Sequence, residues 1–453
     1  MQNIKLYNAL AVLTKKSLEI ISKSIDKNFV VVNESTWVKQ DNETYVRQGM
    51  QRPLWGIVLH KAKDEITKTE EFVEFSKITN SDQIISPQLN TLVGTCMGRS
   101  RFELFSIVFN SLSPFLTDTE IVNFDDQIFK TEYSKIEKAL YSDKIELERL
   151  TPLCGFLTDS PNFVLDDKLS IVKLSDPEVL QMLRLGIKIG DTFGQEDFIH
   201  HIHQFAIKLT YDLPKIAGDG DIQGNIDAHI PYVNGTLEQK LLSALRLFKE
   251  GKIYALGTVV RSNSIFNVGV SYNLGTTSRA FIENKFQLSE TERDKFIKFW
   301  EVYQGTNIPE NNFLSVAIRR FSQANERVST EDKIIDLFIS AEALFLSSGG
   351  SFQGELKYRL SHRAAMFLDD EKDKQREVFK FMQKAYDVRS AIVHGTALNL
   401  PKKDDGMPYL LEEFCKRLES DLRVAINKTI KQASTAKNPN KVLEWDSIIF
   451  PSG

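Results

Sequence analysis

The stretch YDVRSAIVHG, from Tyr386 to Gly395, is the segment that best indicates the fold and function of this chain. It places Arg389 and His394 five residues apart, one a permanent cation and the other a group that exchanges a proton near neutral pH. Together these side chains suit the chemistry of a phosphodiester. Because an Arg and a His at this spacing also occur by chance, the surrounding residues decide what the pair means.

Apolar residues recur at helical spacing through this part of the chain and predict a helix over 374–394. Gly395 follows as a C-terminal stop. Residues five apart lie about 140° apart on an ideal helix, so Arg389 and His394 do not share a face. The small Ser390 and Ala391 would let another helix approach closely, including one from a second copy of the chain. The alternative is structural: Arg389 covers apolar surface with its stem and His394 caps the helix end.

Glu342 lies in the apolar run IIDLFISAEALFL, from Ile334 to Leu346. Its neighbours three and four positions away are all apolar, so on a continuous helix its carboxylate faces the core. A buried carboxylate needs a partner, and Arg389 has similarly apolar neighbours. The sequence therefore predicts that Glu342 and Arg389 meet between two packed helices. The contact would either orient the guanidinium toward a ligand oxygen or serve as an architectural ion pair.

Four separated blocks, in this order along the chain, are similar to those of a known family. They run from Phe313 to Arg327, from Asp332 to Leu346, from Leu356 to Leu368 and from Tyr386 to Gly395. Over roughly residues 290–435, about a third of the chain, they resemble the ApeA-like branch of the HEPN superfamily. The resemblance implies a helical bundle, commonly paired as a dimer. It also implies a metal-independent endoribonuclease whose R-x-x-x-x-H motif forms the active site.

Carried over to this sequence, the resemblance implies that Arg389 and His394 are the catalytic residues. Glu342 takes the place of the supporting polar residue on an earlier helix, and Tyr386 and Ser390 are further supporting residues beside Arg389. The expected reaction is attack of a ribose 2′-hydroxyl on the adjacent phosphorus, with Arg389 neutralising charge and His394 transferring a proton. The alternative is a catalytically inactive HEPN module that binds nucleic acid or a protein.

Composition restricts how RNA could bind. The chain has 453 residues, is 42% hydrophobic and carries a formal net charge of -4, which is ordinary for a globular protein of more than one domain. A general nucleic-acid coat would need a pervasive basic surface, so any RNA contact must be local. The best local patch is LKYRLSHR, in which Lys357, Arg359 and Arg363 are the expected RNA-binding residues.

The first two thirds of the chain predict mixed structure. Runs rich in β-branched and aromatic residues predict strands at 28–33, 55–60, 163–173 and 253–261. Helical patterns at 176–185 and 237–250 alternate with them, which indicates an α+β region. The polar stretch 217–228 predicts a long loop that could subdivide this region.

Cysteine and histidine usage bear on compartment and cofactors. The cysteines are odd in number, widely separated and without a C-x-x-C pair, which favours a reducing cytoplasm. The N-terminus lacks the features of a signal peptide, and no apolar run is as long as a membrane span. His200, His201 and His203 are spaced like metal ligands. No accompanying ligand set is visible, so no metal and no cofactor is expected.

The sequence thus predicts a multidomain protein with an α+β N-terminal region at 1–285, an all-α HEPN helical bundle at 286–435 and a tail at 436–453. The N-terminal region would sense or regulate, through an activator that the sequence does not identify. Expected partners are RNA and a second copy of the chain, as a homodimer or higher oligomer through the HEPN domain, without a membrane. By family resemblance, the role would be that of a regulated effector in prokaryotic antiviral defence or of a toxin-like system.

Overall fold

The computed structural model describes residues 2–28, 31–117, 120–187, 189–190, 198–199, 202–262, 264–266, 271–274, 284–306, 312–347, 355–403, 406–436 and 442–449. The chain divides into two compact units. Unit 1 comprises Met1–Cys154, Asp166–Glu238 and Ala255–Phe281, and unit 2 comprises Gly155–Leu165, Gln239–Tyr254 and Ile282–Gly453. The sequence predicts a division near 285, whereas unit 2 also takes in two earlier segments.

The strands of the described residues form antiparallel sheets and a parallel pair. Their bounds are β1 (Val31–Lys39), β2 (Tyr45–Pro53), β3 (Leu92–Thr95), β4 (Gly98–Arg101), β5 (Lys144–Cys154), β6 (Phe156–Thr158), β7 (Asn162–Val164), β8 (Leu169–Lys173), β9 (Phe198–Ile199), β10 (Phe205–Pro214), β11 (Ile216–Ala217), β12 (Tyr254–Ala255), β13 (Gly257–Ser262), β14 (Ser271–Leu274) and β15 (Phe286–Leu288).

The main sheet of unit 1 has the order β14-β13-β5-β10-β8, and neighbouring strands along this path are antiparallel. Its centre is the pair β5 and β10, registered from Pro152 opposite Ala206 to Lys144 opposite Pro214. Most residues of both strands are buried, as expected for central strands covered on both faces. The described residues of this unit also form two smaller sheets, with the orders β1-β2-β9 and β11-β3-β4.

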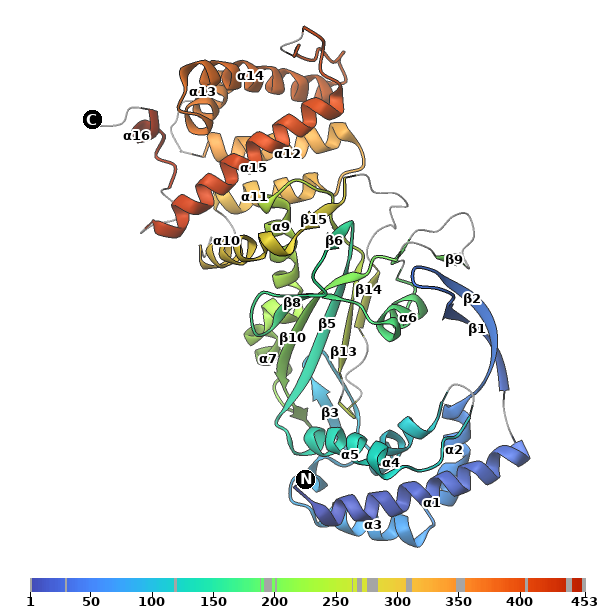
Figure 1. The fold of residues 1–453 in the computed structure, drawn as a ribbon. Helices are drawn as coiled ribbons and strands as arrows, with labels where there is room; N and C mark the ends of the chain where they lie inside the picture. Colours follow the sequence, from blue (N-terminus) through green and yellow to red (C-terminus); the bar gives the residue numbers. More distant parts are fainter. Residues whose placement is uncertain are drawn as a thin grey trace. The chain divides into compact units, whose positions relative to one another are not determined.

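The α-helices are distributed over both units (Figure 1). Their bounds are α1 (Ile4–Asn28), α2 (Trp55–Ile66), α3 (Glu70–Ser81), α4 (Leu104–Leu112), α5 (Asp126–Tyr141), α6 (Asp176–Arg184), α7 (Ile222–Ala228), α8 (Ile230–Val233), α9 (Thr236–Phe248), α10 (Arg293–Gly305), α11 (Phe313–Ala324), α12 (Thr330–Phe345), α13 (Leu356–Leu368), α14 (Lys372–His394), α15 (Leu411–Thr435) and α16 (Trp445–Ile449).

Two predicted elements of unit 1 are wrong. The run at 55–60, predicted as a strand, lies in helix α2, whose buried residues Val58, Leu59, Ala62 and Ile66 follow the helical period. The predicted loop at 217–228 contains β11 and α7. Helix α7 begins where Asp221 accepts a hydrogen bond from the Gly224 amide, so an Asp and Gly pattern that is typical of turns here caps a helix.

The predicted fold class is confirmed: a mixed α+β N-terminal region with antiparallel sheets is followed by an all-helical C-terminal region. The C-terminal region starts where the sequence indicates it, because Ser289 and Glu292 form a capping box just before α10. Within unit 2, α12 packs against α11, α14 and α15, and α13 packs against α14. In Figure 1, α15 (red) runs obliquely across α12.

One apolar core joins the helices of unit 2. Among its buried members are Phe321, Leu337, Phe338, Phe345, Leu360, Phe381, Phe414, Leu418 and Trp445. The segment after 435, expected to be a tail, contributes Trp445 of α16 to this core. Helix α9 contributes Leu247, which explains why a segment distant in sequence belongs to this unit.

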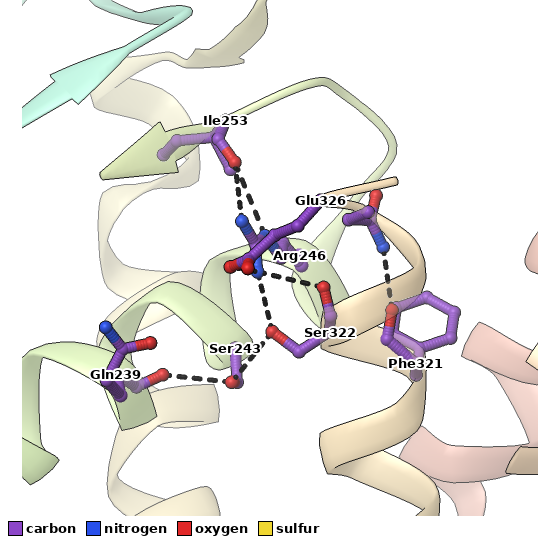
Figure 2. A network of polar contacts seen from close by, with 8 residues as sticks. Gln239, Ser243, Arg246, Ile253, Phe321, Ser322 and Glu326 are labelled. Atoms are coloured by element: carbon purple, nitrogen blue, oxygen red, sulfur yellow. Dashed lines mark hydrogen bonds and ion pairs between the residues drawn. The ribbon is translucent and has the colours of Figure 1, made fainter. Parts of the chain in front are cut away.

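Arg246 fixes α9 within unit 2 (Figure 2). Its side chain is only 1% exposed and donates to the Ile253 carbonyl and to both the carbonyl and hydroxyl oxygens of Ser322 on α11. Its guanidinium also pairs with Glu326 at 3.0 Å. In return, Arg423 and Asn427 of α15 donate to the last carbonyls of α9, which a helix end leaves without internal partners.

We expect Arg246→Ala to lower the free energy of unfolding by about 3 kcal/mol, because it leaves buried oxygens without donors and removes a packed stem. Urea denaturation followed by tryptophan fluorescence measures this. Lys374→Ala is the matched control, since it removes an exposed cation paired with Glu371 three residues away and should leave the free energy of unfolding nearly unchanged. Equal effects of the two substitutions would contradict the assigned role of Arg246.

Candidate active site

Helix α14 ends at the predicted position. Its buried residues Phe381, Met382, Ala385 and Val388 form the stripe that packs on the core. Gly395 then adopts a left-handed conformation, with φ of 64°. Its backbone N–H donates hydrogen bonds to carbonyl oxygens of the last turn. The Thr396 amide donates to the Ala391 carbonyl at 2.9 Å, which completes the termination. The predicted helix over 374–394 and its glycine stop are therefore confirmed.

Arg389 and His394 lie on different sides of this helix end. The helix is continuous from Arg389 to His394, so the two side chains are offset by about 140°. His394 is exposed, whereas Arg389 is half-buried. The Nε atom of Arg389 is buried and has no hydrogen-bond partner in the part of the chain that the structure describes. One helix thus presents an open imidazole on one side and a partly shielded guanidinium on another.

Glu342 lies close enough to Arg389 for the two charges to interact. Burial raises the pKa of the Glu342 carboxyl, and the positive charge of Arg389 offsets only part of this rise. Among the described residues, no hydrogen bond or ion pair joins the two side chains. The predicted proximity is therefore present but the predicted direct pairing is not. Glu342 is also half-buried rather than fully within the core.

Tyr386 and Ser390, the other expected supporting residues, flank Arg389 one turn before it and one residue after it. The Tyr386 ring packs edge-on against Phe338 of α12, with centroids 5.6 Å apart. This contact ties α14 to the helix that carries Glu342. Ser390 is half-buried and adds little bulk at the helix surface.

The residues expected to bind RNA are not alike in the structure. Lys357 donates to both carboxylate oxygens of Asp387, at 2.7 and 2.8 Å, and so links α13 to α14. Arg363 donates to the Phe345 carbonyl at the end of α12 and lies 5.1 Å over the Trp445 ring, so it serves the fold. Arg359 is half-buried on the same helix. The structure therefore does not assemble Lys357, Arg359 and Arg363 into one open cationic patch.

Sequence reasoning missed two exposed lysines on α14, Lys380 and Lys384. They are four residues apart, lie outside the buried stripe of the helix, and face the same side as His394 to within about 80°. Both lysines lie on the predicted helix that also carries the motif histidine. Their spacing of four residues on that helix is the signal in the sequence that could have indicated them.

The predicted histidine cluster is only partly described. His200 and His201 lie outside the described residues, and His203 Nε2 lies 3.0 Å from Cys154 Sγ in unit 1. Among the residues that the structure describes, no group of metal-ligating side chains is arranged to hold a metal ion.

Comparisons with known proteins give no relative: no family model matches the chain, and neither a curated protein nor a solved structure matches it. A membrane-spanning helix is also absent from the described ranges, where no helix combines the length and apolar content that a bilayer requires.

Proposed function

We propose that this chain is a metal-independent endoribonuclease of the HEPN type, with Arg389 and His394 as its catalytic residues. The observation that carries the proposal is the end of α14. There an exposed imidazole follows, five residues later, a guanidinium whose Nε has no hydrogen-bond partner among the described residues. The resemblance of residues 290–435 to the ApeA-like HEPN branch supports the same assignment.

The reaction is transesterification within RNA. The ribose 2′-oxygen forms a bond to the adjacent phosphorus, and the bond from phosphorus to the 5′-oxygen of the next nucleotide breaks. The proton of the 2′-hydroxyl leaves, and the departing 5′-oxygen gains one. His394 performs one of these proton transfers, and Arg389 neutralises the additional negative charge on the phosphoryl oxygens. These two side chains supply a cation and a proton carrier, so the step needs no divalent metal.

Glu342 supports Arg389 by charge rather than by a direct bond. A carboxylate held nearby without occupying the guanidinium donors leaves those donors available to a phosphate. Tyr386 keeps α14 against α12, so the position of Arg389 depends on this packing. Ser390 leaves room beside the motif for a second helix.

A second copy of the chain completes the site in this proposal. The offset of about 140° prevents one helix from directing Arg389 and His394 at the same phosphate. A two-fold interface between helical units would place each α14 end opposite its twin, so that one copy supplies the guanidinium and the other the imidazole. The α+β region would then regulate the nuclease in response to an activator.

The biological setting is proposed on the resemblance. The chain would act in the cytoplasm as a regulated effector of prokaryotic antiviral defence or as a toxin-like enzyme. Among the residues that the structure describes, Cys96, Cys154 and Cys415 form no disulfide, as is usual in a reducing compartment. The competing function is a non-catalytic module that binds nucleic acid or protein through the same helices. Retention of both Arg389 and His394 favours the enzyme.

Incubation of the full chain with single-stranded RNA, with and without EDTA, tests the proposal. We expect the cleavage rate to be the same in both reactions, because Arg389 and His394 perform the chemistry themselves. A magnesium-dependent nuclease added to a parallel reaction must stop in EDTA, which verifies that the chelator works. Cleavage that requires added magnesium would rule out the mechanism, and no cleavage at all would favour the binding module.

A further inference from the structure

Tyr358 of α13 offers an exposed aromatic ring within the helical unit. It is 50% exposed although two neighbouring rings hold it in place. His362, one turn along the helix, lies nearly parallel to it, with centroids 5.7 Å apart and planes 12° apart. Phe379 of α14 packs edge-on against it at 5.6 Å. A ring that is fixed yet open to solvent is suited to stacking with a flat ligand.

Exposed cations lie along α14. Lys380 and Lys384 are four residues apart, a rise of about 6 Å, which is close to the separation of successive phosphates in an extended single strand. Two other cations on this helix already have carboxylate partners: Lys374 pairs with Glu371, and Arg376 pairs with Asp373. Within the described part of the chain, no carboxylate pairs with Lys380 or Lys384.

The same face of α14 continues to His394. On an ideal helix Lys380, Lys384 and His394 fall within about 80° of one another. Asp387 lies on this face between Lys384 and His394 and would repel a phosphate, but Lys357 neutralises it with two hydrogen bonds. In this arrangement Lys357 neutralises a repulsive charge on the face and does not itself bind RNA.

We infer that the exposed Tyr358 ring of α13 and the exposed lysines of α14 together bind single-stranded RNA and direct it toward His394. Tyr358 stacks on an unpaired base, and Lys380 and Lys384 contact successive phosphates. A single strand fits because its bases are free to stack on aromatic side chains, whereas duplex bases are already stacked. The identity of the ligand rests on the proposed function, but Tyr358, Lys380 and Lys384 are separate from the catalytic pair.

The test is the affinity of a short, unstructured, fluorescently labelled RNA, measured by anisotropy over a range of salt concentrations. The parent is the full chain with His394→Ala, so that the RNA stays intact. We expect Tyr358→Ala to weaken binding about tenfold without changing the salt dependence, since it removes a stack and no charge. Tyr358→Phe keeps the ring and should restore the affinity.

The lysines should behave differently. Lys380→Ala with Lys384→Ala should reduce the slope of log affinity against log salt by about 1.4, because each phosphate that a lysine neutralises on a single strand adds about 0.7 to that slope. The control is Lys416→Ala with Lys431→Ala, which makes the same charge change at exposed positions of α15 and should leave the slope unchanged. Equal slopes for the two double variants, or unchanged affinity for Tyr358→Ala, would overturn the inference.

Cleavage measured separately distinguishes this inference from the proposed function. If the wild-type chain cleaves RNA but Tyr358 and the two lysines do not affect binding, the function stands and the RNA path is wrong. If the wild-type chain does not cleave RNA but binding depends on Tyr358 and on both lysines, the path stands and the enzyme assignment is wrong. Absence of any RNA binding by the parent would overturn the path outright.

Discussion

Substitution of His394 by alanine is expected to lower the rate of RNA cleavage by about 10²–10⁴-fold, the usual contribution of a positioned proton-transfer group. The fold should be unaffected, because His394 is exposed at the last position of α14. The free energy of unfolding should change by less than about 0.5 kcal/mol. Gel analysis of a labelled RNA gives the rate, and urea denaturation gives the stability.

His60→Ala is the matched control for this substitution. His60 is also an exposed histidine on a helix, α2 of unit 1, but it has no place in the proposed chemistry. Its variant should cleave RNA at the wild-type rate. If His394→Ala cleaves as fast as His60→Ala, then His394 transfers no proton in the reaction.

Mixing an Arg389→Ala chain with a His394→Ala chain is expected to restore activity that neither has alone. If each site takes its guanidinium from one copy and its imidazole from the other, a dimer has two sites. In a dimer of the two variants, one of these two sites is complete. Half of the dimers in an equal mixture are of this kind, so about a quarter of the wild-type rate should return. The measurement is the cleavage rate of the mixture after subunit exchange, relative to each variant alone.

A chain carrying both substitutions is the control for the mixing experiment. Combined with either single variant it can form no complete site, so its mixtures should stay inactive. Light scattering must show that the variants still associate. If associated variants fail to complement, each catalytic pair belongs to one chain, and a wild-type protein that is fully active as a monomer would exclude the two-copy site.

The helical part of the fold was predictable because its signals are local and long. Helix α14 carries an apolar stripe over several turns and ends at a glycine in the left-handed conformation, so periodicity and the stop agree. The run at 55–60 failed because six residues rich in β-branched and aromatic side chains do not distinguish a strand from a helix. Ala62 and Ile66, which establish the helical period of α2, lie beyond it.

Tertiary contacts explain what the sequence did not predict. Helix α9 belongs to unit 2 because Arg246 reaches Ser322 and Ile253, a relation that local patterns do not contain. In the sequence Arg363 resembled a ligand-binding cation. In the fold it instead donates to the Phe345 carbonyl and lies over the Trp445 ring. The apolar neighbours of Glu342 correctly indicated proximity to Arg389. They did not determine the separation of the two charged groups, which depends on how α12 and α14 pack.

The chemistry of the RNA ends produced in EDTA directly tests whether the 2′-oxygen is the nucleophile. Attack by the 2′-oxygen leaves a 2′,3′-cyclic phosphate on one fragment and a 5′-hydroxyl on the other, and mass spectrometry of the fragments identifies both. We expect these ends from the wild-type chain and their loss with His394→Ala. Fragments ending in a 3′-hydroxyl and a 5′-phosphate would contradict it, because they require water rather than the 2′-oxygen as the nucleophile.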